Sequence, residues 1–247
     1  MKKTIFITGA TSGFGEGIAR MFAKEDYNLI ILGRREEKLK SLKKELSSTK
    51  VHEICLDIRD KEAVFKAVQN LPDEFKNIEI LVNNAGLALG QDKVQDAKIE
   101  DFETMVDTNI KGLLYTTKAT LPLISKNGYI FNIGSIAGNW PYPGGNVYGA
   151  TKAFVRQFSF NLRNDLVGTG IRVTNIEPGI AKTEFSLVRF KGDEEKAESV
   201  YDGTKYLVAD DIAKIILECS KLPQHVNINS LEVMATTQTW AGFAFER

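Results

Sequence analysis

The sequence is poor in the residues that build metal sites and disulfide frameworks. Its 247 residues include two cysteines, Cys55 and Cys219, and two histidines, His52 and His225. Two of each are too few for a disulfide scaffold or a typical zinc site. We therefore expect neither a metal nor a structural disulfide.

Excess charge and long apolar runs are missing as well. Lys and Arg together number 32, Asp and Glu also number 32, and the formal net charge at pH 7 is +0. A protein that binds nucleic acid or an anionic membrane normally shows a basic excess, so neither partner is expected. No stretch approaches the roughly 18 apolar residues of a membrane span, and the apolar run 5–7 is too short for a signal-peptide core. The composition predicts a cytoplasmic protein that acts on small molecules.

Linkers, repeats and low-complexity segments are also absent from the sequence. Its six prolines are scattered, 43% of its residues are hydrophobic and 26% are charged. These proportions are typical of a globular protein, and α/β folds of this length are often a single unit. We predict that residues 1–247 form one domain.

The sequence does contain a regular alternation of short apolar runs with helical patterns. Strands are expected at residues 4–8, 28–32, 51–56, 78–82, 129–133, 171–176 and 227–234. Helices are expected at residues 13–25, 35–46, 60–70, 102–124, 147–167 and 210–220. Apolar strands separated by helices are typical of right-handed βαβ units. The pattern predicts an α/β fold, a Rossmann-type doubly wound parallel sheet of about seven strands with helices on both faces.

A glycine-rich segment joins the first expected strand to the first expected helix. Its glycines, Gly9, Gly13 and Gly15, follow the spacing G-x-x-x-G-x-G. Glycines let a backbone turn tightly against a pyrophosphate, and the helix N-terminus behind them offers free N–H groups. A plain strand-to-helix turn is the alternative, but this context favours a dinucleotide. The expected cofactor contacts here are Gly9, Thr11, Ser12, Gly13, Phe14 and Gly15.

Two arginines at the end of the second strand bear on which dinucleotide binds. An NAD site expects an acidic residue there for the ribose 2′-hydroxyl, whereas this chain has Arg34 and Arg35 after Gly33. Guanidinium groups suit a 2′-phosphate through bidentate bonds. In the alternative, Glu36 and Glu37 neutralise the arginines on a solvated helix. We predict NADP as the cofactor.

A serine, a tyrosine and a lysine form the candidate catalytic set. Tyr148 and Lys152 are four residues apart in an expected helix, so their side chains share one face. A lysine ammonium favours a phenolate, and the pair would then act as an acid or base on an alcohol. Ser135 leaves the fifth strand at its carboxyl end, where ligands of such sheets bind. Alone, the tyrosine–lysine pair is commonplace in structural roles, and the serine equally fits a turn or a helix cap.

Residues beyond Gly179 are candidates for the substrate side. We expect a lid at about 183–205, with Arg189 pairing with a substrate carboxylate. The alternative for Arg189 is a surface ion pair with Asp193 or Glu194. Trp140 and Tyr142 are candidate pocket walls, with core packing as the alternative.

These motifs together resemble the short-chain dehydrogenases/reductases over essentially the whole chain. The matching positions are Thr8–Gly15, Asn83–Gly86, Asn109, Ser135, Tyr148, Lys152, Pro178, Gly179 and Thr183. The resemblance implies that Tyr148 is the acid/base, that Ser135 orients the substrate oxygen and that Lys152 binds the nicotinamide ribose.

The resemblance also implies further cofactor contacts. Asn109 would hold a water of the proton relay, and Asp57, with Ile58 beside it, would lie at the adenine. Asn84 would lie at the adenine-side ribose, and Gly179 to Thr183 would border the nicotinamide. The resemblance further implies a homotetramer in which the helices 102–124 and 147–167 pair across subunits.

A narrower resemblance concerns the substrate. Segments 84–90, 140–142, 144–159 and 188–193 are similar to those of NADP-dependent 3-hydroxy acid dehydrogenases, which oxidise serine or allo-threonine and reduce malonic semialdehyde. The implied reaction is reversible hydride transfer between C3 of a short 3-hydroxy acid and the nicotinamide. Two alternatives stay open: a reductase of other carbonyls such as 3-oxoacyl thioesters, and a protein that senses NADP without turnover.

Overall fold

Seven parallel strands form one central sheet. In this computed structural model, which describes residues 2–240, the strand order is β3-β2-β1-β4-β5-β6-β7. The strands are β1 (Thr4–Thr8), β2 (Asn28–Gly33), β3 (Val51–Cys55), β4 (Ile78–Asn83), β5 (Ile124–Ile133), β6 (Arg172–Pro178) and β7 (Ser230–Val233). Every neighbouring pair is parallel. The predicted doubly wound sheet is confirmed.

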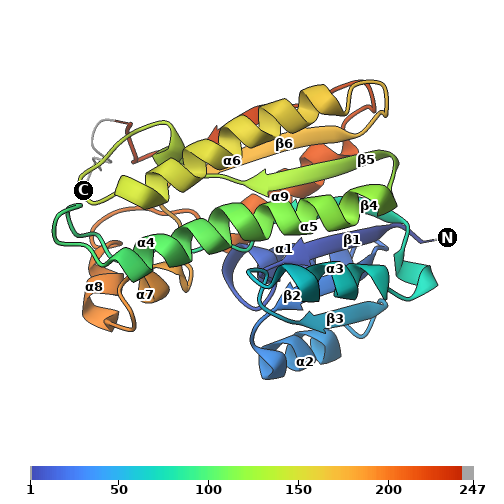
Figure 1. Cartoon of the computed structure of the whole chain (residues 1–247), viewed down its shortest axis with the longest axis horizontal. Coiled ribbons are helices and arrows are strands. Elements are labelled where there is room, and N and C mark those ends of the chain that lie inside the picture. The colour runs from blue at the N-terminus through green and yellow to red at the C-terminus, as the bar shows by residue number, and fades with distance from the viewer. Residues whose placement is uncertain (1, 241–247) are drawn as a thin grey trace.

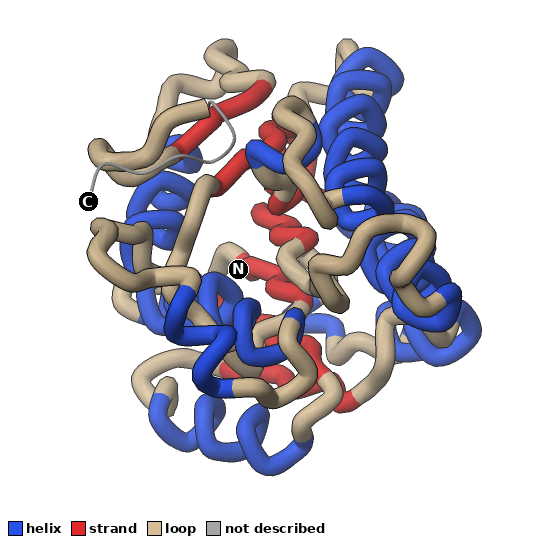
Figure 2. The backbone as a smooth tube through the Cα atoms, turned by 90° about the vertical axis from the view of Figure 1, so that its left-hand side faces the viewer, coloured by secondary structure: helices blue, strands red, loops and turns tan. Residues whose placement is uncertain are grey.

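Helices cover both faces of this sheet, which explains why its strands are continuous apolar runs. The helices are α1 (Gly13–Ala23), α2 (Glu36–Glu45), α3 (Lys61–Gln69), α4 (Ile99–Val106), α5 (Leu113–Thr120), α6 (Asn146–Asp165), α7 (Phe185–Arg189), α8 (Glu194–Ser199) and α9 (Ala209–Lys221). Helices α1, α2 and α9 pack on the face that carries Ile5 and Ile7. Helices α3, α5 and α6 pack on the face that carries Phe6 and Ile30. Figure 2 shows the strands between these two layers.

The chain adds β2 and β3 on one side of β1 and then adds β4 to β7 on the other side, so the order of strand addition reverses at β1. In open α/β sheets, ligands bind at such a reversal, outside the carboxyl ends of the strands. Helices α7 and α8 lie at that end of the sheet (Figure 1). The fold therefore brings the glycine-rich turn after β1, the turn after β5 and the segment after β6 to one edge.

The helix expected over 102–124 is interrupted, and that prediction was wrong in part. Helix α4 ends at Val106, a π-helical segment Asp107–Gly112 follows, and α5 ends at Thr120. A π segment inserts extra backbone into the helical path, a change that apolar periodicity does not reveal. The interruption places Asn109 in the interior, with 2% of its surface exposed.

Other element limits also differ from the predicted ones. Strand β5 begins at Ile124, five residues before the predicted start. Strand β7 is shorter than predicted because the side chain of Asn227 takes over the pairing: it accepts from the Val173 amide at 2.8 Å and donates to the Val173 carbonyl at 3.0 Å. The expected lid contains two short helices, α7 and α8.

No helix in residues 2–240 has the length and apolar character needed to cross a membrane.

Candidate active site

The glycine-rich turn brings backbone close to backbone at the end of β1. Gly9 and Gly13 have φ of 67° and 53°, which favours glycine at both positions. A Cβ on Gly15 would lie 2.3 Å from the Gly9 carbonyl oxygen, so α1 begins hard against the turn. Ser12 is the N-cap of α1, but its hydroxyl makes no capping bond. The turn and the helix N-terminus thus have the form that accommodates a pyrophosphate.

Asn84, the first residue after the neighbouring strand β4, holds this turn. Its side-chain nitrogen donates to the carbonyls of Thr8 at 2.9 Å and Gly9 at 3.1 Å. Both bonds use the nitrogen, so the ribose contact predicted for Asn84 would fall to its side-chain oxygen.

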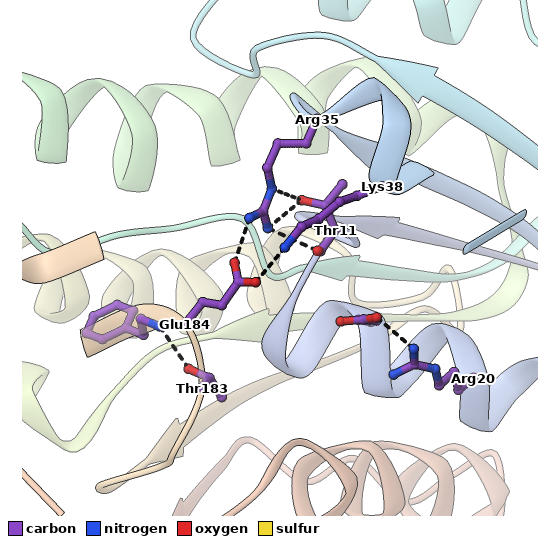
Figure 3. Close-up of polar contacts among 8 residues, drawn as sticks. Thr11, Arg20, Arg35, Lys38, Thr183 and Glu184 are labelled. Carbon is purple, nitrogen blue, oxygen red and sulfur yellow. Dashed lines mark hydrogen bonds and ion pairs between the residues drawn. The ribbon is translucent and has the colours of Figure 1, made fainter. Parts of the chain in front are cut away.

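Arg35 is anchored between the glycine-rich turn and the lid (Figure 3). Its Nε donates to Thr11 Oγ1 at 3.2 Å, and its Nη2 donates to the Thr11 carbonyl at 3.0 Å. Its Nη1 donates to Glu184 Oε2 at 2.6 Å, and Lys38 Nζ donates to Glu184 Oε1 at 2.5 Å. The acid that pairs with Arg35 therefore comes from the lid, 149 positions along the chain.

The alternative that Glu36 and Glu37 neutralise the arginines is wrong. Both glutamates pair with Lys40, one turn along α2. Arg34 lies with its Nη1 3.5 Å from Asp57 Oδ2 and keeps 57% of its side chain exposed. At the predicted 2′-phosphate site, Arg34 is thus only loosely held, whereas Arg35 and Lys38 are bound to Glu184 of the lid.

Asp57, predicted at the adenine, is itself held by a neighbour. Arg59 donates to both of its oxygens, with Nη2 2.7 Å from Oδ2. Burial acts to raise the pKa of Asp57, but the bonds from Arg59 and the charge of Arg34 outweigh it and leave the pKa below its usual value. Ile58 is buried, and its Cδ1 would lie 2.5 Å from a Cβ on Gly112. Ile58 therefore packs against the π segment.

The sheet edge brings Ser135, Tyr148 and Lys152 together. Ser135 follows β5, and its Oγ accepts from the Ala137 amide at 3.1 Å, so it caps a short turn as one alternative proposed. Tyr148 lies in the first turn of α6, and the Lys152 Nζ lies 5.9 Å from its ring centroid. The lysine is buried and donates to the Ile133 carbonyl at 2.7 Å. The three side chains face the carboxyl ends of β5 and β6.

Burial controls the ionisation of this pair in the ligand-free protein. It raises the pKa of Tyr148 to about 12, assisted by the neighbouring Tyr142 hydroxyl, while the charge of Arg189 and a hydrogen bond with Ser135 act in the opposite direction. Burial also lowers the pKa of Lys152 to about 8. In the free protein the pKa of Tyr148 is thus raised and not lowered, contrary to the expectation, because desolvation is the largest influence on it. At neutral pH the phenol carries its proton.

Asn109 reaches this centre from the π segment. Its Nδ2 donates to the Leu87 carbonyl at 2.8 Å and to Thr151 Oγ1 at 3.0 Å, and its Oδ1 accepts from the Leu87 amide at 2.9 Å. A Cβ on Gly86 would lie 3.2 Å from Asn109 Oδ1 and 3.4 Å from Lys152 Nζ. The polar atoms of the Asn109 side chain are thus already bound to Leu87 and Thr151. A water of the proton relay would have to be held by the main chain of the π segment instead.

Arg189 lies over the candidate catalytic tyrosine. Its guanidinium carbon is 5.3 Å from the Tyr148 ring centroid and 5.7 Å from that of Phe185, and its Nη2 donates to the Tyr142 hydroxyl. Its Nε is buried and has no hydrogen-bond partner among residues 2–240. The alternative of a surface ion pair is wrong: among residues 2–240 Arg189 forms no ion pair with Asp193 or Glu194, and Asp193 pairs with Lys196.

Of the two candidate pocket walls, only Tyr142 lies with Tyr148. It packs in one apolar cluster with Tyr148 and Phe185. Trp140 points elsewhere: its Nε1 donates to Glu232 Oε1 on β7 at 3.0 Å, and 41% of its surface is exposed. This geometry separates Trp140 from the candidate site.

The segment after β6 returns over the glycine-rich turn. The Gly179 amide donates to the Val233 carbonyl at 2.7 Å, and a Cβ there would meet Gln238 Oε1 at 2.3 Å. Thr183 Cβ lies 3.2 Å from the position of a Cβ on Gly13. The start of the lid is therefore in contact with the expected pyrophosphate site.

Sequence reasoning missed Glu184 and Phe185. Glu184 pairs with the cations of α2, and Phe185 lies 5.6 Å from the Tyr148 ring, centroid to centroid. The one available signal was their position directly after Thr183, which the family resemblance places at the cofactor. No group of three or more metal-ligating side chains occurs within the described residues.

Comparison with known proteins agrees with this geometry. A model of the family described as short chain dehydrogenase matches residues 3–193. Over 246 residues the chain is 54% identical to the NADP-dependent 3-hydroxy acid dehydrogenase YdfG of Escherichia coli (strain K12), covering 98% of this chain and 99% of that protein. It is 51% identical over 251 residues to Sulfoacetaldehyde reductase 2 of Chromohalobacter salexigens, covering 100% of each.

Among solved structures, the fold is similar to the closed form of serine dehydrogenase complexed with NADP+. The TM-score is 0.93 at 54% identity, with 99% of each chain covered. Serine dehydrogenase from Escherichia coli gives a TM-score of 0.82 at 48% identity, covering 96% of this chain and 100% of that one. The chain belongs to the short-chain dehydrogenase family.

Proposed function

We propose that the protein is an NADP-dependent oxidoreductase that interconverts the 3-hydroxy and 3-oxo forms of short acids. The observation that carries the acid preference is Arg189, a guanidinium beside Tyr148 with a buried Nε that has no partner in residues 2–240. The residue is half-buried, and among residues 2–240 it has no carboxylate partner, so a substrate carboxylate that reaches this guanidinium would gain charge-assisted hydrogen bonds.

The proton steps fall to Tyr148. Its hydroxyl donates a proton to the substrate oxygen during reduction and takes it back during oxidation. A pKa raised to about 12 keeps that proton in place before substrate binds. Ser135 holds the same substrate oxygen by a hydrogen bond.

Lys152 positions the tyrosine and binds the nicotinamide ribose, while the Ile133 carbonyl fixes its ammonium. The main chain around Asn109 would hold a relay water behind the lysine.

The residues at the turn after β2 fit NADP. The glycine-rich turn fits a pyrophosphate, and Arg34, Arg35 and Lys38 offer three cations where the 2′-phosphate would lie. When bound, NADP supplies the hydride acceptor for the alcohol or the hydride donor for the carbonyl. The relatives' names support the same cofactor, since one is called NADP-dependent and one structure contains NADP+.

The substrate proposal is tested with a panel of NADP-linked assays. The panel contains serine and allo-threonine of defined stereochemistry, 3-hydroxypropionate, malonic semialdehyde, sulfoacetaldehyde, a 3-oxoacyl thioester and a neutral aldehyde of similar size. We expect the small substrates that carry a carboxylate or sulfonate to give the highest kcat/KM. If the thioester or the neutral aldehyde is preferred, the protein is another kind of reductase; if NADP binds without any turnover, it is a sensor.

Arg189 is the critical residue in that panel. Replacing Arg189 by Gln should lower kcat/KM about 100-fold or more for the acids and less than about fivefold for the neutral aldehyde, because a charge-assisted pair is lost only with the acids. Lys191→Gln is the matched control, since Lys191 is bound to Asp101 on α4. Equal losses on charged and neutral substrates would contradict the assignment.

A sulfonate is the second candidate substrate group. One relative is named as a sulfoacetaldehyde reductase, and a guanidinium also binds sulfonates through paired N–H groups. The ratio of kcat/KM for sulfoacetaldehyde to that for malonic semialdehyde decides between them.

We also propose one domain over residues 1–247 that assembles as a homotetramer through α4, α5 and α6. Phe154 and Phe158 support this proposal: their rings stack at 5.9 Å on α6 and are only partly buried. Light scattering after gel filtration gives the mass directly, and Phe154→Lys should lower it.

The proposed compartment is the cytoplasm, where NADPH is supplied. Fractionation of cells that produce the protein tests that placement.

A further inference from the structure

We propose that Glu184 sets the cofactor preference by competing with the 2′-phosphate for Arg35 and Lys38. This inference rests on the proposed NADP-dependent function. It assigns a specificity role to a lid residue that lies outside the catalytic set.

The carboxylate occupies the position of an anion between two cations. Its two oxygens accept separate bonds, Oε2 from Arg35 Nη1 at 2.6 Å and Oε1 from Lys38 Nζ at 2.5 Å. Figure 3 shows Glu184 reaching from the lid to both side chains. An oxyanion bridging a guanidinium and an ammonium is the arrangement that a phosphate would adopt with the same groups.

Arg35 cannot serve both anions with the same atoms. Its Nε and Nη2 are already bound to Thr11, which leaves Nη1 as the nitrogen bound to Glu184. A 2′-phosphate must therefore displace Glu184 or approach beside it, where two negative charges repel each other. NAD has no such phosphate and leaves the ion pair intact.

The carboxylate is charged when NADP arrives. Burial acts to raise the pKa of Glu184, but the bonds from Lys38 and Arg35 outweigh it and hold the pKa below its usual value. At neutral pH the site therefore contains an internal anion, and NADP binding includes the cost of breaking its ion pairs.

The competition has a consequence for the lid. Glu184 is the N-cap of α7, whose last residue is Arg189, and it follows Thr183, which touches the glycine-rich turn. Displacing Glu184 releases one attachment of the lid to α2. The 2′-phosphate at the adenosine end would thus loosen the segment that carries Arg189 over Tyr148.

The test compares Glu184→Gln with the unaltered protein in binding two pairs of probes. Dissociation constants are measured by calorimetry for NADP+ against NAD+, and for adenosine 2′,5′-bisphosphate against AMP, which lack the nicotinamide. We expect the variant to bind NADP+ and the bisphosphate about 5- to 20-fold more tightly, with NAD+ and AMP changed by less than about twofold. The salt dependence of the bisphosphate affinity should also steepen, because one anion is gone.

Glu198→Gln is the matched control. Glu198 lies on the same lid but pairs with Lys182, at 2.6 Å, away from α2. It should leave all four affinities unchanged. Weaker binding of both dinucleotides by Glu184→Gln would show a simple lid anchor and overturn the proposal, as would unchanged phosphate discrimination. Failure of the unaltered protein to bind NADP+ would instead overturn the proposed function.

Discussion

At the scale of single residues, burial decides the charge of the two groups at the candidate centre. Tyr148 and Lys152 are both nearly inaccessible, and desolvation favours the neutral form of each. At pH 7 Tyr148 therefore keeps its proton, while Lys152 is charged although its burial disfavours the charge. A bound anionic group would change the protonation equilibria of both Tyr148 and Lys152.

The burial of the charged Lys152 predicts a cost in folding stability that depends on pH. The pKa of Lys152 falls from 10.5 in the unfolded chain to about 8 in the folded protein, so the unfolded state holds more protons between these values. The cost is fully present below pH 8 and disappears as the pH rises to about 10.5. Lys152→Met should therefore raise the free energy of unfolding at pH 7 by about 1–3 kcal/mol, and the gain should shrink as the pH rises to 10. Urea unfolding at a series of pH values measures it.

Tyr148→Phe serves as the control for that experiment. The pKa of Tyr148 is raised, so its ionisation affects stability only above about pH 10, and the variant should show no gain that fades between pH 8 and 10. Both variants should lose turnover, and Tyr148→Phe should keep cofactor affinity. A pH-independent stability change in Lys152→Met would contradict the buried-charge argument.

At the scale of elements, the π segment Asp107–Gly112 determines where Asn109 lies relative to the candidate site. It turns Asn109 inward, where one amide satisfies both backbone groups of Leu87 and the Thr151 hydroxyl. A regular helix of the same sequence would shift this register and leave those groups unpaired.

Removing that amide should be expensive. Asn109→Ala leaves the Leu87 N–H and C=O buried without partners, and we expect a loss of about 2–4 kcal/mol in the free energy of unfolding. Denaturant titration measures it. Asn161→Ala is the control, because Asn161 is an exposed residue of α6 bonded to Gln157; a similar loss there would remove the special role of the π segment.

The elements also show where sequence reasoning succeeds. The order of strands and helices was predictable because apolar periodicity and glycine turns are local signals. The π segment was not, since one inserted residue hardly alters the apolar pattern. Tyr148 and Lys152 could be proposed from their spacing and Ser135 from its place at the end of the fifth strand, because these are local signals. The pairing of Glu184 with Arg35 depends on the lid folding back across the molecule.

At the scale of the whole molecule, the numbers of basic and acidic residues are equal, so the electrostatic attraction of an anion depends on the charges near its binding site. The chain has 32 basic and 32 acidic residues, so no strong overall field steers an anion toward it. Cofactor selection must then come from the few cations at the end of β2. Arg34 is the least restrained of them, with 57% of its side chain exposed.

This locality predicts how salt acts. Raising KCl from about 50 to 500 mM should weaken NADP+ binding several-fold, because exposed charges are screened beyond about 5 Å at the higher concentration, and NAD+ binding should change little. In Arg34→Asp, NADP+ affinity should fall far more than NAD+ affinity, and the salt dependence should flatten. Equal losses for both cofactors would contradict the assignment of Arg34, and fluorescence titration with each dinucleotide provides the measurement.

Glu232 on β7 gathers both of the chain's tryptophans. Trp140 Nε1 donates to its Oε1 at 3.0 Å and Trp240 Nε1 to its Oε2 at 2.8 Å, with the rings 6.4 Å apart. Asn139, at the end of the turn that Ser135 caps, donates to the same carboxylate at 2.7 Å. The tryptophan fluorescence of this protein therefore arises from one place beside the turn that Ser135 caps, so a change in its emission wavelength would report on that turn without any added label.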